Sequence, residues 1–285
     1  MNSMDQRKWE ELEMDCLVEV FKWIGMESLL LCVPLVCKSW YKATLDPKCW
    51  QILVFPEIRC SEHFPGPMIK HFVHSYGLWW HDFPSMSFAK FVVSRSHRSA
   101  TTLVLPGTCS SQALEYISDE CPELKFLGLS LDLLYHNGPV LENLISKWKN
   151  LQVLSVGNCY MLNEIFAQIR LHCKKFVGVI CCYSWIGYEE ASAIASLPKI
   201  KYLSFRKAHC HLNNLLMILE SCRELELLEL RDCGGFDCDD EIRRLASHIQ
   251  TFRCDRSNTS KEDDDYHYFA GEEQARLVYN NFLNM

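Results

Sequence analysis

Residues 225–230 read Leu-Glu-Leu-Leu-Glu-Leu, and residues 124–129 read Leu-Lys-Phe-Leu-Gly-Leu. Both stretches place apolar residues at their first, fourth and sixth positions. The last two of these positions are two residues apart, which is the period of a strand with one buried face. The same triplet occurs seven times: Ala100, Leu103, Leu105; Leu124, Leu127, Leu129; Leu151, Leu154, Val156; Phe176, Val179, Cys181; Ile200, Leu203, Phe205; Leu225, Leu228, Leu230; and Ile249, Phe252, Cys254.

The spacing of these triplets is nearly constant. Successive middle positions, from 103 to 252, are separated by 24, 27, 25, 24, 25 and 24 residues. Leucine-rich repeats have periods of roughly 20 to 29 residues, and each repeat supplies a strand and a return helix or turn. We therefore expect about seven stacked repeats over residues 100–256. Since one repeat cannot bury its own apolar faces, neighbouring repeats must pack together.

The segments between the triplets carry the return helices of the predicted solenoid. In the last but one, Leu212, Leu215, Leu216 and Leu219 form a single apolar stripe at three- and four-residue steps. The expected helices are residues 112–118, 139–148, 162–172, 188–195, 212–221 and 241–248.

Composition excludes several classes of protein. A formal charge of -7 over 285 residues argues against a nucleic-acid-binding surface. No apolar run approaches the roughly 20 residues that span a bilayer, and the N-terminus does not resemble a signal peptide. We expect a nuclear or cytoplasmic protein that binds neither nucleic acid nor membrane, with its sixteen cysteines reduced.

No motif predicts catalysis, a metal site or a cofactor. The chain contains no C-x-x-C pair, no G-x-S-x-G elbow, no glycine-rich phosphate loop and no H-E-x-x-H. His209 and His211 flank Cys210, but one such triplet is weak support for a metal or thiol site. The sequence favours a non-enzymatic protein without a cofactor.

Residues 9–50 predict a small helical unit. Apolar residues recur at three- and four-residue steps: Leu12, Cys16, Leu17, Val20, Phe21 and Ile24. Ser28 is a candidate N-cap of a second helix, and Pro34 suits the first turn of a third helix that would run to Thr44 with Val36, Cys37, Trp40 and Tyr41 facing inward. So short a unit buries little surface by itself, which suggests that it has a partner.

This N-terminal unit resembles an F-box. The resemblance rests on Trp9-Glu-Glu-Leu12, on the Val36-Cys-Lys-Ser-Trp40 block, and on Asp46, Pro47 and Trp50. The repeats resemble the cysteine-containing repeats of F-box proteins, with Cys121, Cys173 and Cys222 before the strands and Cys159 and Cys233 after them. Over residues 9–254 the chain is most similar to plant F-box/leucine-rich-repeat proteins. It departs from the family at Glu13, where proline is usual, and at Cys16.

The resemblance implies the substrate receptor of an SCF (Skp-cullin-F-box) ubiquitin ligase. Its F-box would bind a Skp-type adaptor, and through it a cullin, while the repeats hold a protein substrate. The implied adaptor-docking residues or their immediate support are Leu12, Leu17, Val20, Phe21, Leu35, Val36, Trp40 and Trp50. Two alternatives stay open: a protein-binding scaffold outside ubiquitin transfer, and a small-molecule-dependent F-box receptor.

The residues between the buried leucines of each strand face the concave side of a solenoid. Three arginines fall at such positions near one end, and arginine and aromatic residues are frequent interface anchors. Guanidinium groups also suit acidic or phosphorylated segments. The predicted target-binding residues are Tyr202, Arg206, Glu229, Arg231 and Arg253.

The expected fold is α/β, with a three-helix F-box followed by a short leucine-rich-repeat solenoid. The expected boundaries are 9–52 for the F-box, 53–99 for a linker and solenoid cap, 100–256 for the repeats, and 257–285 for an acidic, partly flexible tail. Within the tail, Tyr266 to Phe269 could pack back onto the repeats.

Overall fold

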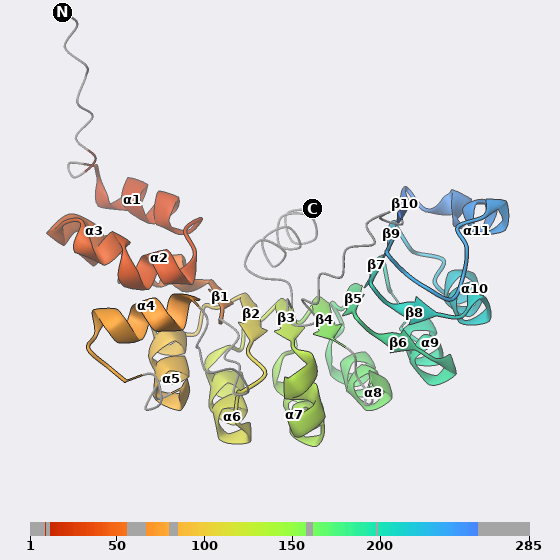
Figure 1. Ribbon diagram of the computed structural model, residues 1–285, viewed down its shortest axis with the longest axis horizontal. Helices are drawn as coiled ribbons and strands as arrows, with labels where there is room; N and C mark the ends of the chain where they lie inside the picture. The colour runs from red at the N-terminus through yellow and green to blue at the C-terminus, as the bar shows by residue number, and fades with distance from the viewer. Residues whose placement is uncertain are drawn as a thin grey trace, which may run out of the picture.

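The computed structural model describes residue 9 and residues 12–55, 67–79, 85–157, 162–197 and 199–255. The expected tail over 257–285 and Cys159 lie outside these residues. Within them the chain forms a curved solenoid, with one sheet along its concave side and a row of helices along its convex side (Figure 1). The three helices of the N-terminal unit lie at the N-terminal end of the solenoid, beyond β1 and above α4 in this view (Figure 1).

The main sheet has eight parallel strands in the order β1-β2-β3-β4-β5-β7-β9-β10, and β6 and β8 form a second small sheet. The strands are β1 Ile52–Val54, β2 Thr102–Leu105, β3 Phe126–Leu129, β4 Val153–Gly157, β5 Gly178–Cys182, β6 Trp185–Ile186, β7 Tyr202–Arg206, β8 His209–Cys210, β9 Leu227–Arg231 and β10 Thr251–Asp255. The helices are α1 Met14–Phe21, α2 Met26–Leu31, η2 Val33–Leu35, α3 Lys38–Ala43, η3 Pro47–Trp50, α4 Pro67–Ser75, α5 Ser85–Arg95, α6 Ser111–Glu120, α7 Leu131–Leu144, η5 Ile145–Lys147, α8 Leu162–His172, α9 Tyr188–Ala195, α10 Leu212–Ser221, α11 Asp240–Leu245 and η6 Ala246–His248.

All seven predicted strands are present, and the α/β solenoid is confirmed. The middle residues of the triplets are directly paired from strand to strand, beginning with Leu103 opposite Leu127 and ending with Leu228 opposite Phe252. From Leu103 to Leu228 these middle residues are fully buried under the helices. Each contributes about 1.5 to 3 kcal/mol when covered, so the regular spacing forms one continuous core.

Strand β1 was not predicted; it begins at the last residue of the expected F-box and continues into the expected linker and cap. Leu53 of β1 pairs with Leu103 of β2 and is fully buried. Trp50, Leu53 and Phe55 have the same spacing as the seven triplets, and the 50 residues from Leu53 to Leu103 equal two repeat lengths. Because this interval supplies α4 and α5 and no described strand, the regular series of triplets is interrupted there.

Three helix boundaries differ from those predicted. The helix expected from Pro139 begins at Leu131, because the Ser130 hydroxyl caps it by accepting a hydrogen bond from the Leu133 amide, and Pro139 lies inside it. Ser28 lies within α2, whose N-cap is Gly25. The helix expected from Pro34 to Thr44 is split into η2 and α3, since Cys37 has an extended backbone.

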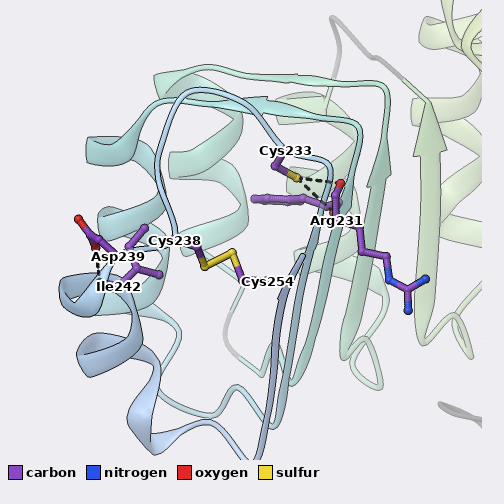
Figure 2. The surroundings of a disulfide bond; sticks show 7 residues. Arg231, Cys233, Cys238, Asp239, Ile242 and Cys254 are labelled. Carbon is purple, nitrogen blue, oxygen red and sulfur yellow. Dashed lines mark hydrogen bonds between the residues drawn. A yellow bond between two sulfur atoms is a disulfide. The ribbon is translucent and has the colours of Figure 1, made fainter. Parts of the chain in front are cut away.

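The expectation that every cysteine is reduced is wrong at one pair, Cys238 and Cys254, which form a disulfide. The bond joins the loop before α11 to β10 on the helix-covered side of the sheet (Figure 2). Elsewhere the repeat cysteines have the expected packing role. The Cys173 thiol lies 3.4 Å from the Trp148 carbonyl oxygen, and the Cys233 thiol lies 3.3 Å from that of Phe205. These thiols therefore satisfy backbone carbonyls at the turns.

Candidate functional site

The N-terminal helices expose an unusual share of large apolar side chains. Of sixteen such exposed side chains among the described residues, eight belong to the first 45 residues of the chain: Trp9, Met14, Val20, Trp23, Leu35, Val36, Tyr41 and Leu45. We call these eight residues the N-terminal apolar patch. A concentration of exposed apolar side chains of this kind is typical of a protein-interaction surface.

The predicted adaptor residues divide into a surface group and a supporting group. Leu35 and Val36, at the end of η2, are 78% and 58% exposed, and Val20 on α1 is also exposed. Leu17, Phe21 and Trp50 are instead buried in the core of the unit. The three exposed residues can touch a partner directly, whereas the buried three can only hold the surface in place.

Two tryptophans link the surface of this unit to its core. Trp40 packs edge-on against Phe21, with ring centroids 5.2 Å apart, and its indole nitrogen donates to the Trp9 carbonyl oxygen. The indole nitrogen of Trp50 donates to the Thr44 carbonyl oxygen at 2.7 Å. Leu12 is half-buried and packs on the same core. These aromatic contacts and hydrogen bonds therefore hold the exposed residues of the patch in place.

Trp23 and Tyr41 also belong to this surface, although the sequence did not indicate it. Val36 and Tyr41 were expected to face inward on one continuous helix, but both are exposed. The extended backbone at Cys37 changes the rotational phase between η2 and α3, so residues on either side of it no longer share a helix face. The exposed Trp23 lies after the end of α1, so the helical periodicity does not predict the direction of its side chain.

The concave face of the sheet has an apolar region over β2 to β5. Five side chains that point away from the helices form a cluster separate from the main core: Val104, Phe126, Val153, Ile180 and Cys182. We call this cluster the concave apolar strip. Its members are only 0 to 6% exposed. A β-carbon placed at Gly128 would lie 3.0 Å from a Val104 methyl, so the missing side chain makes room for its neighbour.

The charged part of the concave face lies over β7, β9 and β10. The buried Glu229 carboxylate accepts hydrogen bonds from the Ser204 hydroxyl at 2.8 Å and from Arg206 at 2.7 and 3.1 Å, and its other oxygen lies 2.8 Å from Arg231 Nε. Burial by itself raises the pKa of Glu229, but Arg206, Ser204 and Arg231 together outweigh it and hold that pKa below its usual value of about 4.5. Glu229 is therefore ionised and pairs with two arginines.

The other two predicted target residues lie on β7 and β10, the two strands next to that of Glu229. Arg253 of β10 lies directly opposite Glu229 in the sheet register and is exposed. Tyr202 is mostly buried, and its hydroxyl donates to Glu226 at 3.3 Å. All five predicted residues therefore lie at one end of the concave face, but Arg206 and Arg231 are ion-paired within the protein, which the sequence did not indicate.

The described residues offer no obvious catalytic or metal-binding arrangement. No group of three or more His, Cys, Asp or Glu side chains that could hold a metal occurs in the described ranges. His209 stacks on Trp185 with ring centroids 4.2 Å apart. Burial raises the pKa of Cys210 to about 12, which makes its thiol a poor nucleophile near neutral pH. None of the described helices has the length and apolar composition to cross a membrane.

A small apolar cavity lies among Phe55, Phe88, Leu105 and Ile117, beneath β1 and β2. It encloses about 30 Å³. That volume holds about one water molecule and is far below the few hundred Å³ of a typical small-molecule site. This cavity does not favour the small-molecule-dependent alternative.

Comparisons with known proteins agree with the fold. No protein-family model matches the chain. The F-box protein FBW2 of Arabidopsis thaliana is 27% identical over 249 residues, which cover 83% of this chain and 71% of that protein. An F-box/LRR-repeat protein of the same plant is 26% identical over 227 residues, covering 79% and 72%. Putative F-box/LRR-repeat protein 23, also from Arabidopsis thaliana, is 24% identical over 263 residues, covering 89% and 55%.

Proposed function

We propose that this chain, an F-box/leucine-rich-repeat protein of the plant type, is the non-catalytic substrate receptor of an SCF-type ubiquitin ligase. In this proposal the N-terminal apolar patch binds a Skp-type adaptor, and the adaptor connects the chain to a cullin. The concave face of the repeats holds a protein substrate. The proposed site of action is the nucleus or the cytoplasm.

The observation that carries the proposal is the exposure of Leu35, Val36 and their neighbours on a small helical unit whose buried residues belong to the same core as the repeats. Exposed apolar side chains contribute nothing to the stability of the isolated chain, whereas burial at an interface contributes about 0.8 kcal/mol per CH₂ group. The unit resembles an F-box at these same positions. An adaptor with a complementary apolar groove would bury them.

The junction between the F-box and the repeats suits a receptor that must hold its target in a fixed place. The Gln51 carbonyl oxygen, next to β1, accepts hydrogen bonds from the Thr101 and Thr102 amides at 2.9 and 3.0 Å. Helix α2 also packs against β1 and α4. The F-box is therefore continuous with the first strand of the solenoid, so an adaptor on the patch and a target on the repeats would keep one relative orientation.

The test is a binding titration of a purified Skp-type adaptor with the wild-type chain and the double variant Leu35→Ala, Val36→Ala. Truncation removes five carbons that are mostly exposed in the free chain. Scaled by that exposure, the loss is about 3 kcal/mol, or roughly a 100-fold weaker affinity. Circular dichroism should be unchanged because neither residue belongs to the core.

Leu171→Ala is the matched control, since Leu171 is 59% exposed on α8 and lies outside the F-box. It should bind the adaptor as the wild type does. If the wild type binds no adaptor, the ligase proposal fails and the scaffold alternative takes its place. If the double variant binds like Leu171→Ala, the adaptor contacts a surface other than the one proposed.

A further inference from the structure

We propose that the C-terminal segment, residues 256–285, docks on the concave face of its own solenoid. Its acidic run, Glu262 to Asp265, would lie beside the arginines of β7, β9 and β10. Its apolar residues would cover the concave apolar strip. The docking itself is independent of the ligase proposal, but its consequence for target binding rests on that proposal.

The burial of the concave apolar strip requires a cover. Val153 and its four neighbours point away from the helix layer, and every described helix of the repeats lies on the opposite face of the sheet (Figure 1). Neighbouring side chains can shield one another from the side, as Val104 does over Gly128, but they do not shield the top of a single-layered sheet. Exposure of 6% or less therefore points to an apolar occupant.

The C-terminal segment has the composition of such an occupant. Its apolar residues Ala275, Val278, Tyr279, Phe282 and Leu283 follow the spacing i, i+3, i+4, i+7 and i+8, the pattern of one face of an amphipathic helix. Polar residues, among them Glu273, Asn280 and Asn284, fall on the opposite face. The stripe is wide enough to cover a row of side chains from neighbouring strands.

The C-terminal segment is long enough to reach and cover the concave apolar strip. The strip crosses four strands, β2 to β5, which span about 14 Å at the usual strand spacing. Thirteen helical residues, 272–284, span about 20 Å. The sixteen residues before them can reach up to about 50 Å when extended, more than the roughly 14 Å from β10 to β5. The segment can therefore cover the strip without strain.

Charge follows the same order along the segment and along the sheet. Leaving β10 at Asp255, the segment first passes the acidic run Glu262 to Asp265, and its apolar stripe follows from Ala275 onward. The sheet presents Arg253, Arg231 and Arg206 nearest β10, balanced by Glu229 and Asp255, and the apolar strip farther along. Figure 2 shows the Arg231 side chain extending from the sheet on the side opposite the disulfide. Acidic residues of the segment would therefore lie beside the arginines near β10, and its apolar residues would lie over the concave apolar strip.

This arrangement identifies the kind of target that the concave face would accept. A target must displace the C-terminal segment, and it competes best by offering the same two features in the same order. The expected target is thus an acidic stretch followed by an amphipathic apolar helix. The chain would bind such a target more weakly while its own segment stays docked.

Cys182 provides a native probe, because it belongs to the strip and the C-terminal segment contains no cysteine. Full-length wild-type chain and the double variant Val278→Asp, Phe282→Asp are treated with a maleimide, and labelling of Cys182 is followed by mass spectrometry. We expect at least a tenfold faster rate in the variant. The charge-matched control Asn280→Asp, Asn284→Asp should label like the wild type. Cys181, which faces the core, reports unfolding of the strand itself.

A second measurement identifies the occupant and does not depend on that variant. Phe282→Cys is treated with a short bifunctional maleimide in a mixture of ¹⁴N- and ¹⁵N-labelled chains. A cross-link to Cys182 within one chain supports the proposal. A cross-link found only between chains would assign the face to a second copy, and no cross-link together with an unchanged Cys182 rate would overturn the docking. Neither readout involves adaptor, so failure of the ligase proposal would be recognised separately.

Discussion

Replacing Glu229 with glutamine should destabilise the repeats, because it removes the only carboxylate between Arg206 and Arg231 in the described part of the concave face. Glu229 is buried and accepts from Ser204 and Arg206 while pairing with Arg231. Glutamine has nearly the same shape but is neutral, and its amide group cannot accept from both arginines. The variant therefore isolates the effect of charge from that of packing.

The expected loss is about 2 kcal/mol near neutral pH. Removing one partner of a fully buried ion pair costs about 3 to 5 kcal/mol. Here the side chains of Arg206 and Arg231 remain 22% and 47% exposed, so water offsets part of that cost. The loss also depends on pH. The pKa of Glu229 is lowered in the folded chain, so its charge stabilises the fold above the unfolded value of about 4.5, and this stabilisation is lost as the pH falls through the folded pKa.

The assay is urea unfolding followed by circular dichroism at several pH values. Wild type and Glu229→Gln should differ near pH 7 and converge at acidic pH, where both side chains are neutral. Glu226→Gln is the matched control. Its pair with Lys201 is about 40% exposed on both sides and should contribute less than about 1 kcal/mol. Equal stability of wild type and Glu229→Gln at pH 7, or a difference that persists unchanged at pH 3, would show that the Glu229 charge does not stabilise the fold.

Two further predictions concern the last repeats. Reduction of the disulfide between Cys238 and Cys254 should lower the free energy of unfolding by about 3 kcal/mol, as expected for a loop of 16 residues, and Cys238→Ser should make the urea midpoint insensitive to reductant. Gly235→Ala should lower the melting temperature sharply, since the added β-carbon would lie 2.4 Å from the Cys210 carbonyl oxygen. Gly77→Ala, at a similar positive φ but with open space around it, should cost only about 1 to 2 kcal/mol, and equal effects of the two substitutions would contradict the clash.

The repeat architecture could be predicted from the sequence because its signal is local and recurrent. Each strand is specified by three apolar residues within six positions, and seven such strands in register exclude other arrangements of the same leucines. The predicted start of a helix was wrong where two local signals, a proline and a serine N-cap, compete. Pro139 suggested a helix start, but the cap at Ser130 lies nine residues earlier.

The candidate site could be predicted only in part. The alternation along each strand placed Arg206, Arg231 and Arg253 on the concave face, where the structure has them. It did not show that Glu229 pairs with Arg206 on the neighbouring strand and with Arg231 on its own strand, because ion pairing depends on side-chain reach and burial in the folded chain. Likewise, helical periodicity could not separate exposed Val36 from buried Phe21 in the N-terminal unit.

The strand positions, the repeat period and the resemblance of residues 9–50 to an F-box follow from the sequence alone, since they depend on residues a few positions apart. The exposure of particular apolar residues and the pairing of particular charges become evident only in the folded chain. The same is true of the bond between Cys238 and Cys254 and of the pairing of β1 with β2. Each of these outcomes depends on segments that meet in space through the stacking of repeats or the crossing of helices, and burial and pairing are set by that meeting.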